Sequence, residues 1–347
     1  MANCRISLKP LHPRDEATGY SARGLKHLTG NGRADPQLPF SRSEFIAELP
    51  KAQAGMSISG YQPKLQVVHH NGAFNVVDHQ GDYILKPSPA EFPYLAENEH
   101  ATMTLMSRLG FTVPPHGLVR FAKTQSDAQE EYAFIVRRFD RDAQGKALHQ
   151  EQLDAAMNVG EKYGKIREDG KQYVSYQQLA EFLLAHVNDN LAFKIDLLRR
   201  IAYAYLLGNN DMHLRNFGLI LPIAGDPELA PVYDFVSVAP YPAAFNSGFL
   251  ALPLLRCEEG EQDLAPGMKT QYAEYLGKDF LLLGEAMGLA NAVVLRLFAQ
   301  MQKEAITVEN IYRASFMPES DVESVLQCYR HRLHRMMNVD EPEILQA

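Results

Sequence analysis

The densest group of side chains that could do chemistry lies in residues 208–216, which spell Gly-Asn-Asn-Asp-Met-His-Leu-Arg-Asn. Two apolar runs follow and predict an antiparallel hairpin with strands over 217–223 and 229–233. A tight turn between antiparallel strands puts the start of the first strand beside the end of the second. We therefore expect Asn216 and Asp234 to be neighbours, with Asp211 on the preceding loop.

These three side chains suit phosphoryl transfer. An amide oxygen and a carboxylate, from Asn216 and Asp234, are hard ligands for Mg²⁺ bound to a phosphate chain. The carboxylate of Asp211 can orient an attacking hydroxyl and accept its proton. Asp and Asn are also common turn formers, but their combination on a helix, loop and hairpin favours the catalytic interpretation. The rival is a metal-dependent hydrolase site built from Asp211, His213 and Asp234, although the chain offers no other clustered ligand set.

A second pair of charged residues is expected further upstream. Lys86 ends a predicted strand, and Glu99 lies on the apolar stripe of a helix predicted over 94–109. A buried unpaired charge is expensive, so Glu99 needs a cationic partner. A strand lysine paired with a helix glutamate holds the α- and β-phosphates in kinases. The alternative is a solvated lysine and a glutamate at the edge of the apolar face.

Residues 57–64, Ser-Ile-Ser-Gly-Tyr-Gln-Pro-Lys, precede the first predicted strand. The segment has one glycine, Gly60, so it matches neither a P-loop nor a Gly-x-Gly-x-x-Gly loop. Its position two strands before Lys86 is nevertheless that of a loop covering phosphates.

The elements that must position these residues fall into two regions. Strands are predicted over 65–69, 74–77, 83–86, 111–121 and 132–137. Beyond them apolar helices dominate, predicted over 191–207, 266–302 and 320–337, together with a helix capped by Ser175 and Gln178. The expected fold is α+β and bilobal, with an irregular arm over 1–50, a β-rich ATP-binding lobe over 51–140 and a helical catalytic lobe over 141–347.

The composition of the chain limits the classes of protein to which it can belong. The chain has 347 residues, 46% of them hydrophobic, and a net charge of −8, which disfavours direct binding to nucleic acid. Its three cysteines, Cys4, Cys257 and Cys328, are widely scattered and fit a reducing cytosol. No apolar leader is predicted at the start of the sequence. The most apolar stretch, 280–301, contains Glu285 and Arg296, which indicates a packed helix and not a membrane span. We expect a cytoplasmic protein.

Taken in order, these motifs resemble those of the HipA-like toxin kinases of bacterial toxin–antitoxin systems. The resemblance runs from about residue 55 to 240, and its most specific part is the Asp211-x-His213-x-x-Asn216 loop with Asp234 downstream. Its other parts are the segments 57–64, 84–87, 97–99 and 136–141. The resemblance implies a protein-kinase-like fold and a serine/threonine kinase that uses ATP and Mg²⁺.

Carried over residue by residue, the resemblance implies a role for each matching position. The catalytic centre would comprise Asp211 as base, His213, and Asn216 and Asp234 as Mg²⁺ ligands. The residues implied for nucleotide binding are Ser57, Ser59, Gly60, Lys64, Lys86, Glu99, Val136, Arg137 and Phe139, the last three at the adenine-binding hinge. Arg137 departs from the glutamate that many members carry there. Ser57 and Ser59 would be autophosphorylation sites that control the ATP pocket.

Only residues 1–56 precede the serine loop, whereas longer members carry an additional subdomain, so the chain is similar to the short, HipT-like branch. That branch implies two partners: an antitoxin with a DNA-binding domain and a separate small protein equivalent to the missing subdomain. The implied substrate is an aminoacyl-tRNA synthetase, with the tryptophanyl enzyme expected, and its phosphorylation would inhibit translation. The alternative is a catalytically silent kinase-like module that sequesters a partner or nucleotide.

Overall fold

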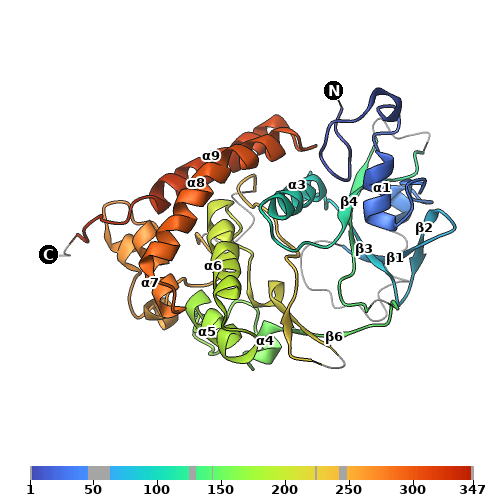
Figure 1. Cartoon of the computed structure of the whole chain (residues 1–347). Coiled ribbons are helices and arrows are strands. Elements are labelled where there is room, and N and C mark those ends of the chain that lie inside the picture. Colours follow the sequence, from blue (N-terminus) through green and yellow to red (C-terminus); the bar gives the residue numbers. More distant parts are fainter. Residues whose placement is uncertain are drawn as a thin grey trace. The chain divides into compact units, whose positions relative to one another are not determined.

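A computed structural model of the chain describes residues 2–45, 63–124, 130–142, 144–222, 225–241 and 248–344 (Figure 1). The chain forms two compact units. Unit 1 comprises residues 1–147 and 310–318, and unit 2 comprises residues 148–309 and 319–347. None of the described helices combines the length and the apolarity that a membrane crossing requires.

Unit 1 is built on an antiparallel sheet of five strands. Their order is β2 (Ala73–Val77), β1 (Leu65–His70), β3 (Tyr83–Pro87), β5 (Tyr132–Arg137) and β4 (His116–Arg120). The predicted turn between the first two strands is confirmed, because Asn71 and Gly72 both have positive φ, at 52° and 84°. Strand β4 is shorter than the predicted 111–121, since Pro114 and Pro115 offer no backbone N–H to a neighbouring strand.

Helix α3 (Leu95–Arg108) lies against strands β3, β4 and β5 of this sheet (Figure 1). Every residue from Leu95 to Met106 is buried, so the helix is enclosed on all sides. Gly110, with φ 91°, turns the chain just after the helix, as predicted.

The segment before the sheet differs from the irregular arm expected over residues 1–50. Its described part, 2–45, contains the 3₁₀ helix η1 (Pro13–Asp15) and helix α1 (Ala22–Thr29), which Ser21 caps by accepting from the Gly24 N–H. Buried side chains from this part share one hydrophobic cluster with the sheet; they include Ile6, Leu25, Leu28, Phe45, Leu65, Val67 and Leu85. The segment is therefore part of the core of unit 1.

Residues 310–318 return to unit 1 from far along the chain. Tyr312 is fully buried, and its hydroxyl lies 2.8 Å from the hydroxyl of Thr102 on α3. The Asn3 side chain donates to the Ala314 carbonyl at 2.9 Å, and the Arg5 guanidinium lies 4.9 Å from the Phe316 ring centre. This return was not predicted from the sequence.

Unit 2 is mainly helical. Its helices are α4 (Leu153–Ala156), α5 (Tyr176–His186), α6 (Leu191–Leu206), α7 (Gly277–Ala286), α8 (Asn291–Arg313, with 310–313 assigned to unit 1) and α9 (Glu319–Met336). Helix α6 packs against α5, α7 and α9. The single helix predicted over 266–302 is wrong: the 3₁₀ helix η4 (Pro266–Lys269) comes first, and Gly288, with φ 72°, separates α7 from α8.

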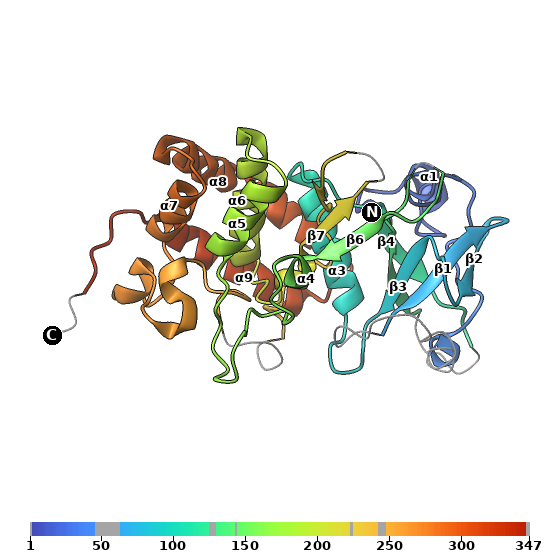
Figure 2. The same ribbon diagram turned by 90° about the horizontal axis from the view of Figure 1, so that it is seen from below.

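A small antiparallel sheet in unit 2 carries the predicted hairpin. Its strands are β6 (His149–Gln152), β7 (Gly218–Leu221) and β8 (Glu228–Leu229), in that order. Figure 2 shows β6 beside β7. Leu219 pairs with Leu229, and the Ala230 N–H continues the ladder by donating to the Gly218 carbonyl at 2.8 Å. The hairpin exists, with shorter strands than predicted.

Candidate active site

The loop after α6 is fixed by its own hydrogen bonds. Gly208, with φ 70°, turns the chain out of the helix, and its carbonyl accepts from the Val238 N–H at 3.1 Å. The side chain of Asn209 accepts from the Asp211 N–H at 3.2 Å. The 3₁₀ helix η2 (Leu214–Asn216) then completes the turn. The Asp211 side chain is left 27% exposed, so it can meet a substrate from solvent.

Asn216 is oriented by the backbone of this loop. Its Nδ2 donates to the Asp211 carbonyl at 2.8 Å, so the amide oxygen faces away from that contact. Strand β7 begins two residues after Asn216, and the pairing with it ends at Ala230, four residues before Asp234. The Tyr233 hydroxyl, next to Asp234, donates to the Arg215 carbonyl at 2.8 Å. An amide oxygen and a carboxylate at this end of the ribbon form a donor set that fits Mg²⁺.

Asp234 has a left-handed backbone conformation, with φ 50°. Asp and Asn tolerate this region better than most residues, because their short polar side chains can bond locally. Backbone strain at a non-glycine residue is typical of functional sites.

His213 and Tyr163 flank the Asp211 carboxylate. The Tyr163 hydroxyl donates to Asp211 Oδ1 at 2.8 Å, and His213 Nε2 lies 3.8 Å from the same oxygen. The two rings pack edge to face with centres 5.2 Å apart. Burial lowers the pKa of His213, while the charge of Asp211 acts in the opposite direction. Tyr163 was not predicted from the sequence, because it lies 48 positions before Asp211 with no motif around it.

The loop is anchored to its surroundings at two further points. Arg215 donates from Nε to Asp154 Oδ2 on α4 at 2.6 Å, where the Asp154 side chain is only 8% exposed. The buried Tyr176 hydroxyl donates to the Met212 carbonyl at 2.6 Å. The position of Asp211 is therefore fixed by contacts before and after it.

In unit 1 the expected ion pair is confirmed. Lys86 Nζ lies 2.6 Å from Glu99 Oε1, and both side chains are almost fully buried. The ammonium also lies 5.6 Å from the ring centre of Phe134 on the neighbouring strand. The alternative of a solvated lysine and an edge-facing glutamate is excluded.

The predicted hinge lies at the end of strand β5. Val136 is buried and pairs with Ile84, Arg137 is exposed at the strand end, and Phe139 is half-buried. Strand β5 also places Phe134 opposite Lys86, so the predicted hinge and the lysine occupy adjacent strands.

Of the predicted phosphate-covering loop, Lys64 lies just before β1 and is half-buried. Ser57, Ser59 and Gly60 lie outside the described residues.

The described residues contain no group of three or more His, Cys, Asp and Glu side chains arranged to hold a metal ion. Asp211, His213 and Asp234 therefore do not form the ligand cluster that the rival hydrolase needs. The Asn216 and Asp234 pair is a different donor set, because one of its two ligands is an amide.

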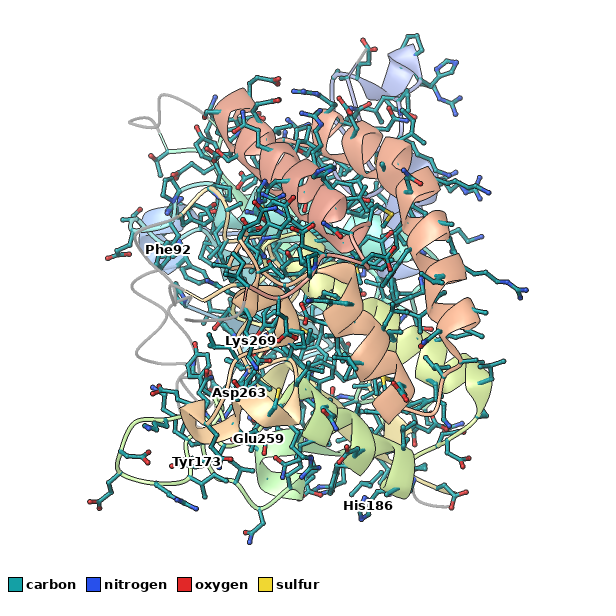
Figure 3. All side chains as sticks on the ribbon, turned by 90° about the vertical axis from the view of Figure 1, so that its left-hand side faces the viewer. Phe92, Tyr173, His186, Glu259, Asp263 and Lys269 are labelled. Atoms are coloured by element: carbon teal, nitrogen blue, oxygen red, sulfur yellow. The ribbon has the colours of Figure 1, made fainter. Side chains whose placement is uncertain are left out.

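A cavity of about 780 Å³ lies within unit 2, and two of its lining residues are hydrogen-bonded to Asn210 and Tyr163. Its wall includes Gly248, whose carbonyl accepts from Asn210 Nδ2 at 3.2 Å, and Gln172, whose Nε2 donates to the Tyr163 carbonyl at 3.0 Å. The paired side chains of Asp263 and Lys269, 2.8 Å apart, also line it and are labelled in Figure 3. No sequence pattern predicted this cavity.

Comparison with known proteins gives consistent matches. Residues 56–308 match the HipA-like C-terminal domain. A Haemophilus influenzae protein named "Putative kinase" is 55% identical over 342 residues, which cover 98% of this chain and 99% of that protein. The "Serine/threonine-protein kinase toxin HipA" of Shewanella oneidensis is 28% identical over 201 residues, which cover 54% of this chain and 44% of the toxin.

Among solved structures, the chain is similar to Shewanella oneidensis HipA in a complex with HipB and operator DNA. The TM-score is 0.61 at 22% identity, and the match covers 86% of this chain and 71% of HipA. A likeness at this level of identity shows a shared fold, and the α+β, kinase-like fold expected from the sequence is confirmed.

Proposed function

This chain belongs to the HipA-like family, and from that premise we propose that it is a serine/threonine protein kinase that uses Mg-ATP and acts as a toxin. The observation that carries the proposal is the contact between Asn216 Nδ2 and the Asp211 carbonyl. This contact orients the Asn216 amide, whose oxygen would ligate Mg²⁺, on the same loop as the partly exposed Asp211 carboxylate, which supports a site for phosphoryl transfer.

For unit 2 we propose the following chemistry. A serine hydroxyl of the substrate hydrogen-bonds to the Asp211 carboxylate, which takes the proton as the hydroxyl oxygen bonds to the γ-phosphorus of ATP. The bond from that phosphorus to the β–γ bridging oxygen breaks, and ADP leaves. Asn216 and Asp234 would hold Mg²⁺, which supplies positive charge to the phosphate oxygens when bound.

For unit 1 we propose that Lys86 contacts the α- and β-phosphates of ATP. Its ion pair with Glu99 is buried and short, so the ammonium is held in a fixed position on strand β3. The exposed end of β5, at Arg137, would offer backbone groups to adenine together with Val136 and Phe139. Lys64 would provide further charge to the phosphates.

The substrate and partners are part of the same proposal. We propose an aminoacyl-tRNA synthetase as substrate, with the tryptophanyl enzyme expected, so that translation is inhibited in the cytoplasm. The solved Shewanella oneidensis HipA is in complex with HipB and operator DNA, which supports a DNA-binding antitoxin as partner. A separate small protein as third partner, and control by autophosphorylation at Ser57 and Ser59, are also proposed.

The test is phosphate transfer from labelled ATP to a panel of purified synthetases in the presence of Mg²⁺. Mass spectrometry then identifies the labelled protein and the modified serine. Wild-type protein should label one synthetase, and Asp211→Asn should label none while still folding and binding ATP. If the wild type labels neither a synthetase nor itself, and Asp211→Asn still binds a partner equally well, the silent binding module is the better description.

A further inference from the structure

The segment between α4 and α5 approaches the catalytic loop through two consecutive residues, Lys162 and Tyr163. The Lys162 carbonyl accepts from the Leu214 N–H at 3.0 Å, at the start of η2. The Tyr163 hydroxyl donates to Asp211 Oδ1 at 2.8 Å, and its ring packs against His213. One backbone and one side-chain hydrogen bond therefore hold this pair in place beside the catalytic aspartate.

Lys162 carries a positive charge and forms no ion pair with a carboxylate among the described residues. Its Nζ lies 4.6 Å from the centre of the Tyr163 ring, so the ring that contacts Asp211 also holds the ammonium by a cation–π contact. Among the described residues, no carboxylate oxygen lies within 4.0 Å of Lys162 Nζ. The side chain is only half-buried, so its ammonium can reach a bound ligand.

The catalytic loop has two other basic side chains near Asp211, and both are already engaged by neighbouring groups. Arg215, four positions after Asp211, is bound to the buried carboxylate of Asp154 at 2.6 Å. His213 is buried, with its ring packed against Tyr163. Among the described residues that contact this loop, Lys162 therefore remains available as a cation beside Asp211.

Phosphoryl transfer needs such a cation. Negative charge spreads over the oxygens of the transferred phosphoryl group, and fixed positive groups that meet it there lower the barrier. Lysine suits this task because it is a compact point charge on a long flexible stem.

We propose that Lys162 and Tyr163 complete the phosphotransfer centre: Tyr163 positions the Asp211 carboxylate, and Lys162 contacts the γ-phosphoryl oxygens. This proposal rests on the proposed kinase function. As the substrate hydroxyl oxygen bonds to the γ-phosphorus, Asp211 takes the hydroxyl proton and the bond to the bridging oxygen of ADP breaks. The Lys162 ammonium keeps its protons throughout and balances the charge of the moving group.

The first experiment measures whether Lys162 lies beside the γ-phosphate of bound ATP, independently of enzyme activity. An ATP derivative with an acyl group on its γ-phosphate acylates lysine amines that lie beside that phosphate. After proteolysis, mass spectrometry should find acylated Lys162, with the label suppressed by excess ATP. Lys165, exposed three positions further on the same segment, is the control and should show no suppression by ATP.

The outcomes separate this proposal from the kinase function on which it rests. If calorimetry shows ATP binding and the protein transfers phosphate, yet Lys162 carries no ATP-protected label, the proposal is overturned and the kinase function stands. If ATP does not bind at all, both are overturned.

The second experiment uses variants. Lys162→Met should lower kcat by roughly 100-fold or more, the loss typical of one transition-state donor, with the KM for the protein substrate nearly unchanged. Lys162→Arg should restore part of the rate, because the charge is retained. Lys165→Met is the matched control, and an equal loss in both methionine variants would contradict the role of Lys162.

Tyr163→Phe tests the positioning role. It should lower kcat by roughly tenfold, the value of one hydrogen bond to a charged group, while the affinity for ATP is kept. Tyr173→Phe is the matched control, because the Tyr173 hydroxyl donates at 2.6 Å to Asp169 on the same segment and not to Asp211. A variant that loses ATP affinity and melting temperature along with kcat would show that Tyr163 is merely structural.

Discussion

Lys86 Nζ and Glu99 Oε1 lie 2.6 Å apart, and their side chains are 3% and 5% exposed. A pair so deeply buried adds little stability over an apolar pair, because both charges have lost their hydration. Losing one partner is different, since the remaining charge is then buried alone. The pair can therefore be tested for stability and for nucleotide binding separately.

Lys86→Met should lower the free energy of unfolding by about 3–5 kcal/mol, because Glu99 is left without its partner. The double variant Lys86→Met, Glu99→Leu should regain most of that loss and still fail to bind ATP. Urea unfolding followed by circular dichroism gives the first quantity, and calorimetry gives the second. A double variant as unstable as the single one would show that the buried charge is not the cause.

Glu97, two residues before Glu99, makes the stability of unit 1 depend on pH. Burial raises the pKa of Glu97 from 4.5 to about 7, with the Ser88 hydroxyl as a weak opposing donor. Because the folded state holds the proton more tightly than the unfolded state, the contribution of Glu97 to stability is greatest below pH 4.5. It falls as the pH rises toward 7, by about 3 kcal/mol in total.

Glu97→Gln should remove this dependence, because glutamine resembles the protonated form. Near neutral pH and above, the variant should be more stable than the wild type by roughly 3 kcal/mol, and near pH 4.5 equally stable. His100 and His116 have pKa values lowered by burial to about 3 and about 4, and they act in the opposite direction in both proteins. The difference between variant and wild type is therefore the quantity to measure, with the exposed Glu91→Gln as control.

A substitution at Asp234 can remove the proposed metal ligand without lowering the stability of the fold. Its φ of 50° costs a side-chain-bearing residue roughly 1–2 kcal/mol, whereas glycine adopts it freely. Asp234→Gly should therefore keep the free energy of unfolding within about 1 kcal/mol of the wild type. We expect it to abolish Mg²⁺-dependent phosphate transfer, as measured with labelled ATP. Transfer that persists in this variant would contradict the role of Asp234 as a metal ligand.

The serine loop can be tested although it lies outside the described residues. A phosphate at Ser57 or Ser59 would bring close to two negative charges to a loop expected to cover the phosphates of ATP. Glutamate at both positions should weaken ATP binding and slow transfer, and alanine at both should not. Equal ATP affinity in the glutamate and alanine variants would show that charge on this loop has no regulatory effect.

Local signals made much of the fold predictable. The Asn71–Gly72 turn fixed the β1–β2 hairpin, and Gly110 and Gly208 marked the ends of α3 and α6. The charge of Glu99 on an apolar stripe predicted its pairing with Lys86, because the cost of burying a lone charge is large.

Other features have no local signal. Helix α1 is short and lies in a polar segment, so only its packing against the sheet reveals that Leu25 and Leu28 are core residues. Tyr163 reaches Asp211 across 48 positions through tertiary structure alone. The break at Gly288 was missed because apolar periodicity continues on both sides of it.

The return of residues 310–318 to unit 1 affects how the chain folds during synthesis. Tyr312 completes the core beside Thr102, yet the ribosome must add residues 148–318 after the sheet before Tyr312 and its neighbours are available. At roughly 5–20 residues per second, this delay is on the order of ten to thirty seconds. A nascent chain shorter than about 318 residues therefore lacks part of the core of unit 1, so the complete kinase fold would form only when synthesis is nearly finished.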